Sequence, residues 1–258
     1  MKRVIDFSKY SSIKIGPKIE VDVIEDEKIG DRFLVGGANN LLISPNPPKL
    51  AILSKKFDYI EIFKDYIEIG GATKSGRIIS FAKKNNIAGF EFLGKLPGTL
   101  GGLIQMNAGV KEYEIFNILE EVFIDNRWYK KSEIKYGYRY TDIKGVIKRA
   151  RFKISFGFDN ELLEKLSNLR KNQPKEPSAG SFFKNPQGEF AGKLIESVGL
   201  KGKRVGNMAW SNIHANFLIN LGGGKFSEAM ELINLAKDKV LERYGILLEE
   251  EVKILKQD

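Results

Sequence analysis

The sequence predicts an α+β protein, and three observations carry this prediction. The first part of the chain holds short β-type runs separated by turn residues, at 21–24, 32–35, 51–53, 59–62 and 66–69. Helical periodicity is confined to a few separate stretches, of which the longest covers 226–244. The chain has 258 residues, 42% of them apolar, with no repeat and no low-complexity tract. This length is sufficient for a large core divided into two or three compact units.

The middle of the chain predicts a helix, a glycine-rich segment and two strands. A helix is expected over 75–86, where Ile78, Ile79 and Ala82 fall on one face. The glycine-rich segment follows, and strands at 121–125 and 149–155 close this part of the chain.

A domain boundary is predicted within 156–175. A polar helix over 161–172 ends before Pro174, because proline disfavours helical backbone in the residue that precedes it. Beyond the boundary we expect a short helix over 189–198 and a strand over 215–220.

The helix over 226–244 is the strongest signal in the second part of the chain. Ser227 is expected to cap its start and Gly245 to end it. A last strand is expected over 246–255. The apolar stripe of the helix, which we assign to the core, consists of Ala229, Leu232, Ile233, Ala236 and Val240.

Composition excludes several classes of function. The chain has no cysteine, so it has neither disulfides nor thiol redox chemistry, and any redox chemistry needs a bound organic cofactor. A single histidine, His214, excludes a histidine-rich metal site, and we expect no metal. The net charge of +9 allows nucleic-acid binding, but no recognition motif carries the charges, so we expect no nucleic-acid partner. No secretory or membrane segment is recognisable, which predicts a cytoplasmic protein without membrane insertion.

Two glycine-rich elements, LVGGANNLLIS at 34–44 and EFLGKLPGTLGGLIQMNAG at 91–109, are candidates for a pyrophosphate site. Glycine lets backbone N–H groups approach an anionic ligand closely. Neither element has a standard nucleotide fingerprint, and each taken alone is more typical of a tight turn.

The segment PSAGSFFKNP at 177–186 gathers Ser181, Lys184 and Asn185 in a turn framed by glycine and proline. Such side chains on stiff backbone suit proton donation and contacts to phosphate or carboxylate. An ordinary polar surface turn is the alternative.

The two glycine-rich elements and the serine segment occur in the order and near the spacing of a known family. Four further parts of the chain fit the same order: Tyr138 with Arg139, AGKLIESVGLKG at 191–202, SNIHANFLIN at 211–220 and LEEEV at 248–252. The chain resembles, nearly end to end, the UDP-N-acetylenolpyruvoylglucosamine reductases (MurB), within the wider group of FAD oxidases related to vanillyl-alcohol oxidase. The resemblance implies an FAD-binding region at 1–49 to which 246–258 returns, an FAD-binding domain at 50–158, and a smaller α+β substrate domain at 159–245. No segment for a tyrosine-bearing lid insertion is present, which indicates the shorter subtype.

The resemblance also implies a reaction and its residues. NADPH reduces non-covalently bound FAD, and hydride then passes to the enolpyruvyl methylene of UDP-N-acetylglucosamine enolpyruvate, giving UDP-N-acetylmuramate for peptidoglycan. Arg139 would stabilise the developing negative charge, and Ser181 would donate the proton. Strand alternation alone favours Glu250 as the buried functional acid, whereas the family pattern points to Glu251, which requires a local bulge. We follow the family and keep the conflict open.

Contacts to both ligands are implied in the same way. For FAD they are Gly36, Gly37, Ala38, Asn39, Asn40, Leu41, Pro97, Gly98, Thr99, Met106, Asn107 and Ala108, and for substrate Tyr138, Lys184, Asn185 and His214. Three positions depart from the family pattern: Asn39 replaces serine, Thr141 replaces serine, and VKEYE replaces Ala-Tyr-Gly after Gly109.

Two alternatives remain open beside this interpretation. A related FAD oxidase would often tether its flavin through histidine or cysteine, and His214 lies outside the cofactor loops. A basic binding protein on the same scaffold would hold nucleic acid and no flavin. A lone histidine beside an apolar strand is more often a structural residue, so His214 is at most a hydrogen-bond donor near substrate. We expect a monomer.

Overall fold

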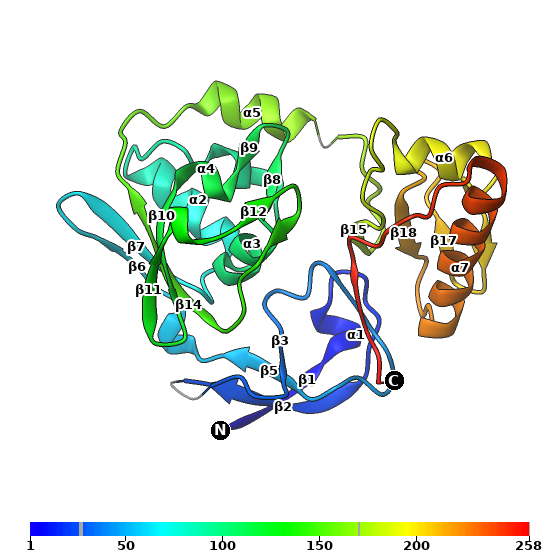
Figure 1. Cartoon of the computed structure of the whole chain (residues 1–258), viewed down its shortest axis with the longest axis horizontal. Helices are drawn as coiled ribbons and strands as arrows, with labels where there is room; N and C mark the ends of the chain where they lie inside the picture. The colour runs from blue at the N-terminus through cyan, green and yellow to red at the C-terminus, as the bar shows by residue number, and fades with distance from the viewer. Residues whose placement is uncertain (26–27, 170, 258) are drawn as a thin grey trace. The chain divides into compact units, whose positions relative to one another are not determined.

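The computed structural model describes residues 1–25, 28–169 and 171–257, which divide into two compact units (Figure 1). Unit 1 comprises 1–3, 21–37 and 49–171, and unit 2 comprises 4–20, 38–48 and 172–258. The predicted three-part division assigns segments to the ligands that they bind, so it stays a prediction.

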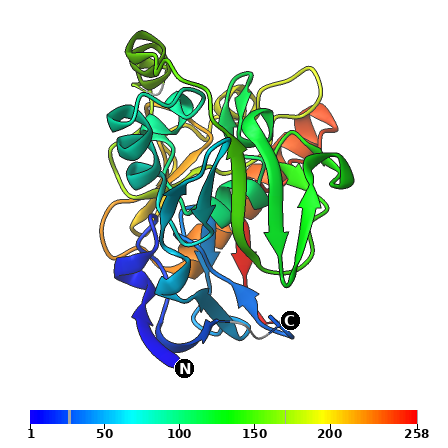
Figure 2. The same cartoon turned by 90° about the vertical axis from the view of Figure 1, so that its left-hand side faces the viewer.

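A five-stranded antiparallel sheet forms the centre of unit 1, in the order β11-β10-β14-β7-β6. Figure 2 shows the green arrows of β10, β11 and β14 side by side. Every second residue faces the core, among them Val122, Ala150 and Ile69. The strands are β6 (Ile60–Ile62), β7 (Tyr66–Gly70), β10 (Leu119–Ile124), β11 (Arg127–Lys130) and β14 (Ile147–Lys153).

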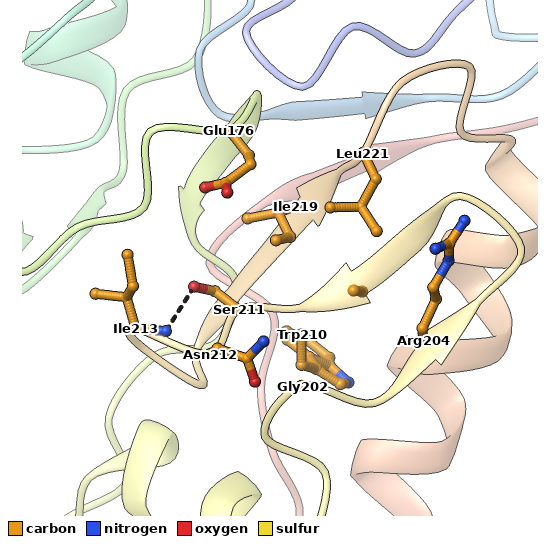
Figure 3. Close-up of a pocket in the computed structure, with 10 residues that line it drawn as sticks. Glu176, Gly202, Arg204, Trp210, Ser211, Asn212, Ile213, Ile219 and Leu221 are labelled. Atoms are coloured by element: carbon orange, nitrogen blue, oxygen red, sulfur yellow. Dashed lines mark hydrogen bonds between the residues drawn. The ribbon is translucent and has the colours of Figure 1, made fainter.

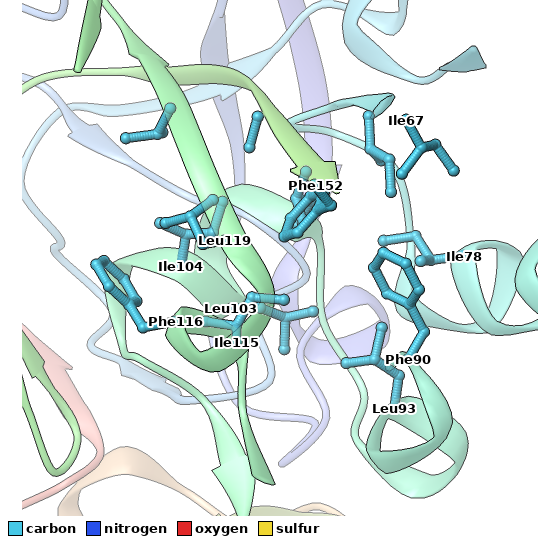
Figure 4. Close-up of a cluster of buried hydrophobic side chains, with 14 of the residues drawn as sticks. Ile67, Ile78, Phe90, Leu93, Leu103, Ile104, Ile115, Phe116, Leu119 and Phe152 are labelled. Carbon is cyan, nitrogen blue, oxygen red and sulfur yellow. The ribbon is translucent and has the colours of Figure 1, made fainter. Parts of the chain in front are cut away.

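Short helices bury this face of the sheet, and Figure 4 shows their side chains meeting those of the strands. Ile78 of α2, Leu103 and Ile104 of α3 and Phe116 of α4 are all at most 3% exposed. The helices are α2 (Ser75–Lys84), α3 (Leu100–Gln105), α4 (Ile115–Ile118) and α5 (Asn160–Asn168), with the 3₁₀ turns η1 (Lys55–Phe57), η2 (Glu91–Lys95) and η3 (Lys131–Glu133).

The opposite face of the sheet uses basic residues to hold strands together. Arg151 stacks 3.9 Å from the ring centroid of Trp128 and donates through Nε to buried Glu68 at 2.9 Å. Glu68 also accepts from the hydroxyl of Tyr59 at 2.8 Å. Burial, and then the hydrogen bond to Glu68, raise the pKa of Tyr59 to about 12. Arg151 is therefore engaged in contacts between neighbouring strands of the sheet.

The other strands outside the central sheet of unit 1 and the sheet of unit 2 form one further sheet, two hairpins and the β4–β19 pair. One four-stranded sheet has the order β1-β2-β5-β3, and its β2–β5 and β3–β5 pairs are parallel. Of the two hairpins, β8–β9 begins at the last residue of the second glycine-rich segment, and β12–β13 accepts a hydrogen bond from Asn107 of that segment through the carbonyl of Gly137. The bounds are β1 (Lys2–Asp6), β2 (Lys18–Ile24), β3 (Phe33–Leu34), β5 (Leu50–Leu53), β8 (Gly109–Val110), β9 (Tyr113–Glu114), β12 (Tyr136–Gly137) and β13 (Tyr140–Thr141).

Unit 2 contains an antiparallel sheet in the order β15-β18-β17-β16 and the helices α1, α6 and α7. The predicted apolar stripe of α7 is fully buried, and Trp210 of β17 donates through its indole N–H to the carbonyl of Leu232 at 3.3 Å. The elements are α1 (Phe7–Tyr10), α6 (Ala191–Ser197), α7 (Phe226–Tyr244), β15 (Ser178–Ser181), β16 (Arg204–Val205), β17 (Met208–Trp210) and β18 (Phe217–Asn220).

The C-terminal strand returns to the first segment of the chain, as predicted. β19 (Lys253–Leu255) pairs in parallel with β4 (Leu41–Ile43), directly after the first glycine-rich loop. Leu42 of this pair packs in the core of unit 2.

Two local predictions were wrong. The strand expected over 246–255 is regular only at 253–255. Ser227 does not cap α7: the N-cap is Lys225, and the Glu228 carboxylate accepts from the backbone N–H groups of Lys225 and Asn207, both at 3.0 Å. These hydrogen bonds lower the pKa of Glu228. Gly245 ends α7 as predicted, with φ +67°.

Over the described ranges, no helix combines the length and apolar composition that crossing a lipid bilayer requires.

Candidate active site

Arg139, the predicted catalytic cation, lies against the second glycine-rich segment within unit 1. Its Nη2 donates to the carbonyl of Gly109 at 3.0 Å and its Nη1 to that of Asn107 at 3.4 Å. Glu114 Oε1 lies 3.9 Å from Nη1. The backbone of Arg139 is left-handed, with φ +54°, a conformation that costs a non-glycine residue free energy and concentrates at functional sites.

Asn107 organises this neighbourhood from a fully buried position. Its amide nitrogen donates to Glu114 Oε2 at 2.7 Å and to the carbonyl of Gly137 at 3.0 Å. Its amide oxygen accepts from the N–H of Phe116 at 3.3 Å. The side chain is therefore saturated inside the protein, so Asn107 would serve a cofactor by shaping the backbone around it.

The first glycine-rich loop presents backbone donors. Ser12 binds the carbonyls of Ala38 and Asn39, whereas the N–H groups of Gly37, Ala38 and Asn39 donate to no acceptor within the described residues. Ala38 has φ +50°. Successive N–H groups with a left-handed residue among them form a concave anion site, which fits the pyrophosphate of a dinucleotide.

Gly36 is required by a close approach to the second loop. A Cβ at this position would lie 2.5 Å from Thr99 Oγ1, and Thr99 is 9% exposed. Gly36→Ala should therefore lower stability by about 1–3 kcal/mol. The combination with Thr99→Ala, which removes the clashing atom, should recover most of that loss. Urea unfolding of both single variants and the double variant measures this coupling, and additive effects would contradict the predicted clash.

Ser181 ends β15 beside a β-bulge in unit 2. Ser178 pairs with Ile219 and Ser181 with Phe217, so three steps along one strand oppose two along the other. Gly180 has φ +88° within the bulge. Ser181 is partly exposed, and its hydroxyl makes no hydrogen bond to any described residue. Bulges re-aim side chains next to active sites, and this one leaves a hydroxyl uncommitted.

The three consecutive glutamates, Glu249, Glu250 and Glu251, make different contacts. Glu249 pairs with Lys184 at 2.5 Å, and Glu250 pairs with Lys237 of α7 at 2.9 Å. The N–H groups of Glu251 and Val252 both donate to the carbonyl of Phe182, at 2.8 and 3.2 Å. Two consecutive N–H groups that donate to one carbonyl form a β-bulge, which is the irregularity that the choice of Glu251 over Glu250 requires. These hydrogen bonds place Glu251 beside Phe182, the residue that follows Ser181.

Asn40 links the first loop to this glutamate segment. Its Nδ2 donates to the carbonyl of Glu251 at 3.0 Å, and its carbonyl accepts from Lys253. Leu41 begins β4 and is buried. Asn185 is exposed, and its Oδ1 accepts from the N–H of Ala191 at the start of α6.

His214 occupies a structural position. Its Nδ1 accepts from the N–H of Asn216 at 3.3 Å, and its ring packs edge-on against Phe217. Asn216 in turn binds both backbone groups of Phe183. Burial lowers the pKa of His214, so the neutral ring is the stable form near pH 7.

This shift predicts that stability falls on acidification. The unfolded chain takes up the His214 proton near its ordinary pKa of about 6.5, before the folded protein does. Thermal unfolding should therefore occur at lower temperature as the pH falls from 7.5 to 5.5. His214→Gln, which keeps an acceptor but does not titrate, should flatten this slope. Parallel curves for the two proteins would contradict the prediction, because the chain has no second histidine.

The other predicted residues are dispersed around these groups. Tyr138 is 54% exposed beside the Arg139 guanidinium. Pro97 is exposed, and Gly98 accepts from the N–H of Ser75. Met106 and Ala108 are partly buried on either side of Asn107.

The predicted residues are therefore divided between the two units. Arg139, Gly36, Thr99 and the segment 106–108 belong to unit 1, whereas Ser181, Asn40, Lys184 and Glu251 belong to unit 2.

Cavities alone do not lead to these groups. One of about 240 Å³ in unit 2 is lined by residues of β16, β17 and β18, including Arg204, Trp210 and Ile219, and Figure 3 shows the Ser211 hydroxyl accepting from Ile213 at 3.0 Å. A second of about 850 Å³ in unit 1 includes Tyr66 and Arg151. None of the predicted site residues lines either cavity.

Two organising residues were not singled out from the sequence: Glu114, which binds Asn107 and faces Arg139, and Asn216, which binds the segment after Ser181. Both act through side-chain contacts to backbone or to other side chains, which no local pattern marks.

Comparisons with known proteins cover the chain nearly end to end. A family model described as UDP-N-acetylenolpyruvoylglucosamine reductase, C-terminal domain, matches residues 173–255. The UDP-N-acetylenolpyruvoylglucosamine reductase of Helicobacter hepaticus is 51% identical over 258 residues, covering 98% of each chain. That of Helicobacter pylori is 49% identical, covering 99% of this chain and all of the relative. The chain belongs to the UDP-N-acetylenolpyruvoylglucosamine reductase (MurB) family.

The structure agrees with this membership. A crystal structure of UDP-N-acetylenolpyruvylglucosamine reductase (MurB) from Thermus caldophilus matches with a TM-score of 0.85 and 30% identity, covering 99% of this chain and all of that one. The MurB-like α+β fold predicted from the sequence is confirmed. As a member of the MurB family, the chain is an enzyme, an oxidoreductase.

Proposed function

We propose that this enzyme uses NADPH and non-covalently bound FAD to reduce UDP-N-acetylglucosamine enolpyruvate to UDP-N-acetylmuramate, a peptidoglycan precursor. The observation that carries the proposal is the uncommitted hydroxyl of Ser181, held at a bulge directly before the carbonyl that binds the Glu251 segment. A proton donor with no acceptor among the residues that the structure describes is available to a substrate.

In this proposal residues 1–49 with 246–258, and residues 50–158, hold FAD, and residues 159–245 bind the substrate. The unbonded N–H groups at 37–39 would receive the pyrophosphate. The other FAD contacts would come from Gly36, Asn40, Leu41, Pro97–Thr99 and Met106–Ala108. When bound, FAD supplies the hydride that adds to the enolpyruvyl methylene carbon.

Arg139 would stabilise the negative charge that develops on the substrate when the hydride adds. Addition at the methylene carbon pushes an electron pair toward the carboxylate-bearing carbon, so negative charge grows on the substrate carboxylate. A guanidinium stays positive throughout and meets a carboxylate with two parallel N–H groups. Its anchoring to the Gly109 and Asn107 carbonyls fixes it before substrate binds, so little reorganisation is needed.

Ser181 would complete the reduction by donating its proton to the carboxylate-bearing carbon. A hydroxyl is a weak acid, so the resulting alkoxide needs nearby compensation and rapid reprotonation. Glu251 would act with Arg139 on the enol through the substrate carboxylate. Tyr138, Lys184, Asn185 and His214 would contact substrate, with His214 limited to its Nε2 because Nδ1 accepts from Asn216. We further propose a cytoplasmic monomer.

An anaerobic visible spectrum tests the function directly. Spectra of the purified protein are recorded alone, after NADPH, and after UDP-N-acetylglucosamine enolpyruvate. We expect flavin absorbance that NADPH bleaches and that only the enolpyruvyl substrate restores. Restoration by oxygen but not by the substrate would replace the proposal with a flavin oxidase. A protein without flavin that is retained by nucleic acid in a salt-dependent manner would replace it with a binding protein.

A further inference from the structure

The segment that departs from the family pattern, VKEYE at 110–114, forms a tight hairpin in the structure. Gly109 and Val110 of β8 pair with Glu114 and Tyr113 of β9, and Lys111 in the turn has φ +53°. A Cβ at Gly109 would lie 2.2 Å from the carbonyl oxygen of Tyr113, so the two strands approach at a distance that only glycine allows. The hairpin thereby sets Glu114 directly opposite Gly109.

Glu114 faces two groups at once. One carboxylate oxygen accepts from the Asn107 amide at 2.7 Å, and the other lies 3.9 Å from Arg139 Nη1. The side chains of Glu114 and Arg139 are 22% and 19% exposed, so solvent screens their attraction only in part.

The two carbonyls that accept from Arg139 belong to the backbone that Glu114 contacts. They are those of Asn107 and Gly109, and the left-handed backbone of Asn107, φ +40°, directs this short stretch. The Asn107 side chain is held by Glu114, Gly137 and Phe116. The Glu114 carboxylate thus has two effects on Arg139. Through Asn107 it holds the backbone that carries the two acceptor carbonyls, and it places a negative charge beside the guanidinium.

We propose that Glu114 is a positioning residue for Arg139: it holds the guanidinium in the orientation that receives the substrate carboxylate. This inference rests on the proposed role of Arg139. Because guanidinium and carboxylate recognition is directional, a small rotation of Arg139 costs rate even though the positive charge is retained.

The test measures the two half-reactions of the flavin-loaded enzyme by stopped-flow absorbance. Glu114→Gln keeps an oxygen that can accept from Asn107 and removes the charge that faces Arg139. We expect it to leave reduction by NADPH unchanged and to slow reoxidation by UDP-N-acetylglucosamine enolpyruvate roughly tenfold. Glu112→Gln is the matched control, since Glu112 lies exposed in the same hairpin, and it should behave as the parent protein.

A double-variant cycle separates positioning from a structural role. If Glu114 acts through Arg139, Glu114→Gln should have no further effect on reoxidation once Arg139→Lys is present. Equal slowing in both backgrounds, or no slowing in the parent background, would overturn the inference.

The same measurements distinguish failure of this inference from failure of the proposed function. If Arg139→Lys alone leaves reoxidation unchanged, the proposed role of Arg139 is wrong. If Arg139→Lys slows reoxidation and Glu114→Gln does not, only the role given to Glu114 is wrong.

Discussion

Replacing Ser181 with alanine should leave flavin reduction by NADPH at its original rate and slow reoxidation by the enolpyruvyl substrate roughly 10²- to 10⁴-fold. In the proposed mechanism the serine donates its proton only after hydride transfer, so the first half-reaction does not need it. The substitution should not disturb the fold, because the Ser181 hydroxyl makes no hydrogen bond to the described residues. Stopped-flow measurement of each half-reaction, with thermal unfolding beside it, checks both statements.

Ser178→Ala is the control for this substitution. It removes a hydroxyl from the other end of the same strand, on the far side of the bulge. We expect both of its half-reactions to match those of the parent. A Ser181→Ala protein that is reoxidised at the parent rate would rule out the serine as proton donor.

Arg139→Lys should slow reoxidation roughly 10²- to 10³-fold, about 3–4 kcal/mol of transition-state stabilisation. Lysine keeps the positive charge but cannot present two parallel N–H groups to a carboxylate. It also cannot reach the Gly109 and Asn107 carbonyls in the guanidinium geometry. The measurement is the substrate dependence of reoxidation, which separates weaker binding from a slower step.

Arg127→Lys is the matched control, because Arg127 is an exposed arginine of the same unit that pairs with Glu133 and stacks on the ring of Tyr129, away from the predicted site residues. Its rates should be unchanged. Comparable losses in both variants would indicate a general effect of arginine removal, and a fully active Arg139→Lys would show that bidentate recognition at this position is unnecessary.

Regular elements with a clear apolar period were predictable from the sequence. The spacing of Ala229, Leu232 and Val240 predicted α7 with the bounds that the structure has. Burial of one helix face produces the spacing of the apolar residues, so the spacing indicates where the helix lies. β17, Met208–Trp210, was missed, since three consecutive buried residues show no alternation. The N-cap of α7 was predicted wrongly because the carboxylate of Glu228 accepts from the Lys225 N–H, and the side chain of Ser227 plays no part in the cap.

The candidate site was predictable as a set of residues but not as an arrangement. The serine loop and the Arg139 segment could be identified from motifs. The contacts of Arg139 with Glu114 and with two carbonyls could not be predicted, because they depend on the turn at Lys111 and on the left-handed backbone of Asn107. The choice between Glu250 and Glu251 likewise depends on a bulge, and a bulge reverses the alternation from which a face is predicted.

The pairing of β19 with β4 also determines when, during synthesis and folding, the first glycine-rich loop can make its last contacts. Asn40 and Glu251 lie 211 residues apart, so a ribosome adds nearly the whole intervening chain before the hydrogen bond between them can form. Contacts of such long sequence separation slow folding, because the entropy of closing the loop is lost before the contact forms. This edge of β4 stays without β19 during synthesis, and Asn40 makes its two hydrogen bonds to Glu251 and Lys253 only when residues 251–255 emerge. If the first glycine-rich loop holds FAD as proposed, nascent chains should therefore become able to retain flavin late, after the helical part of unit 2 has been made.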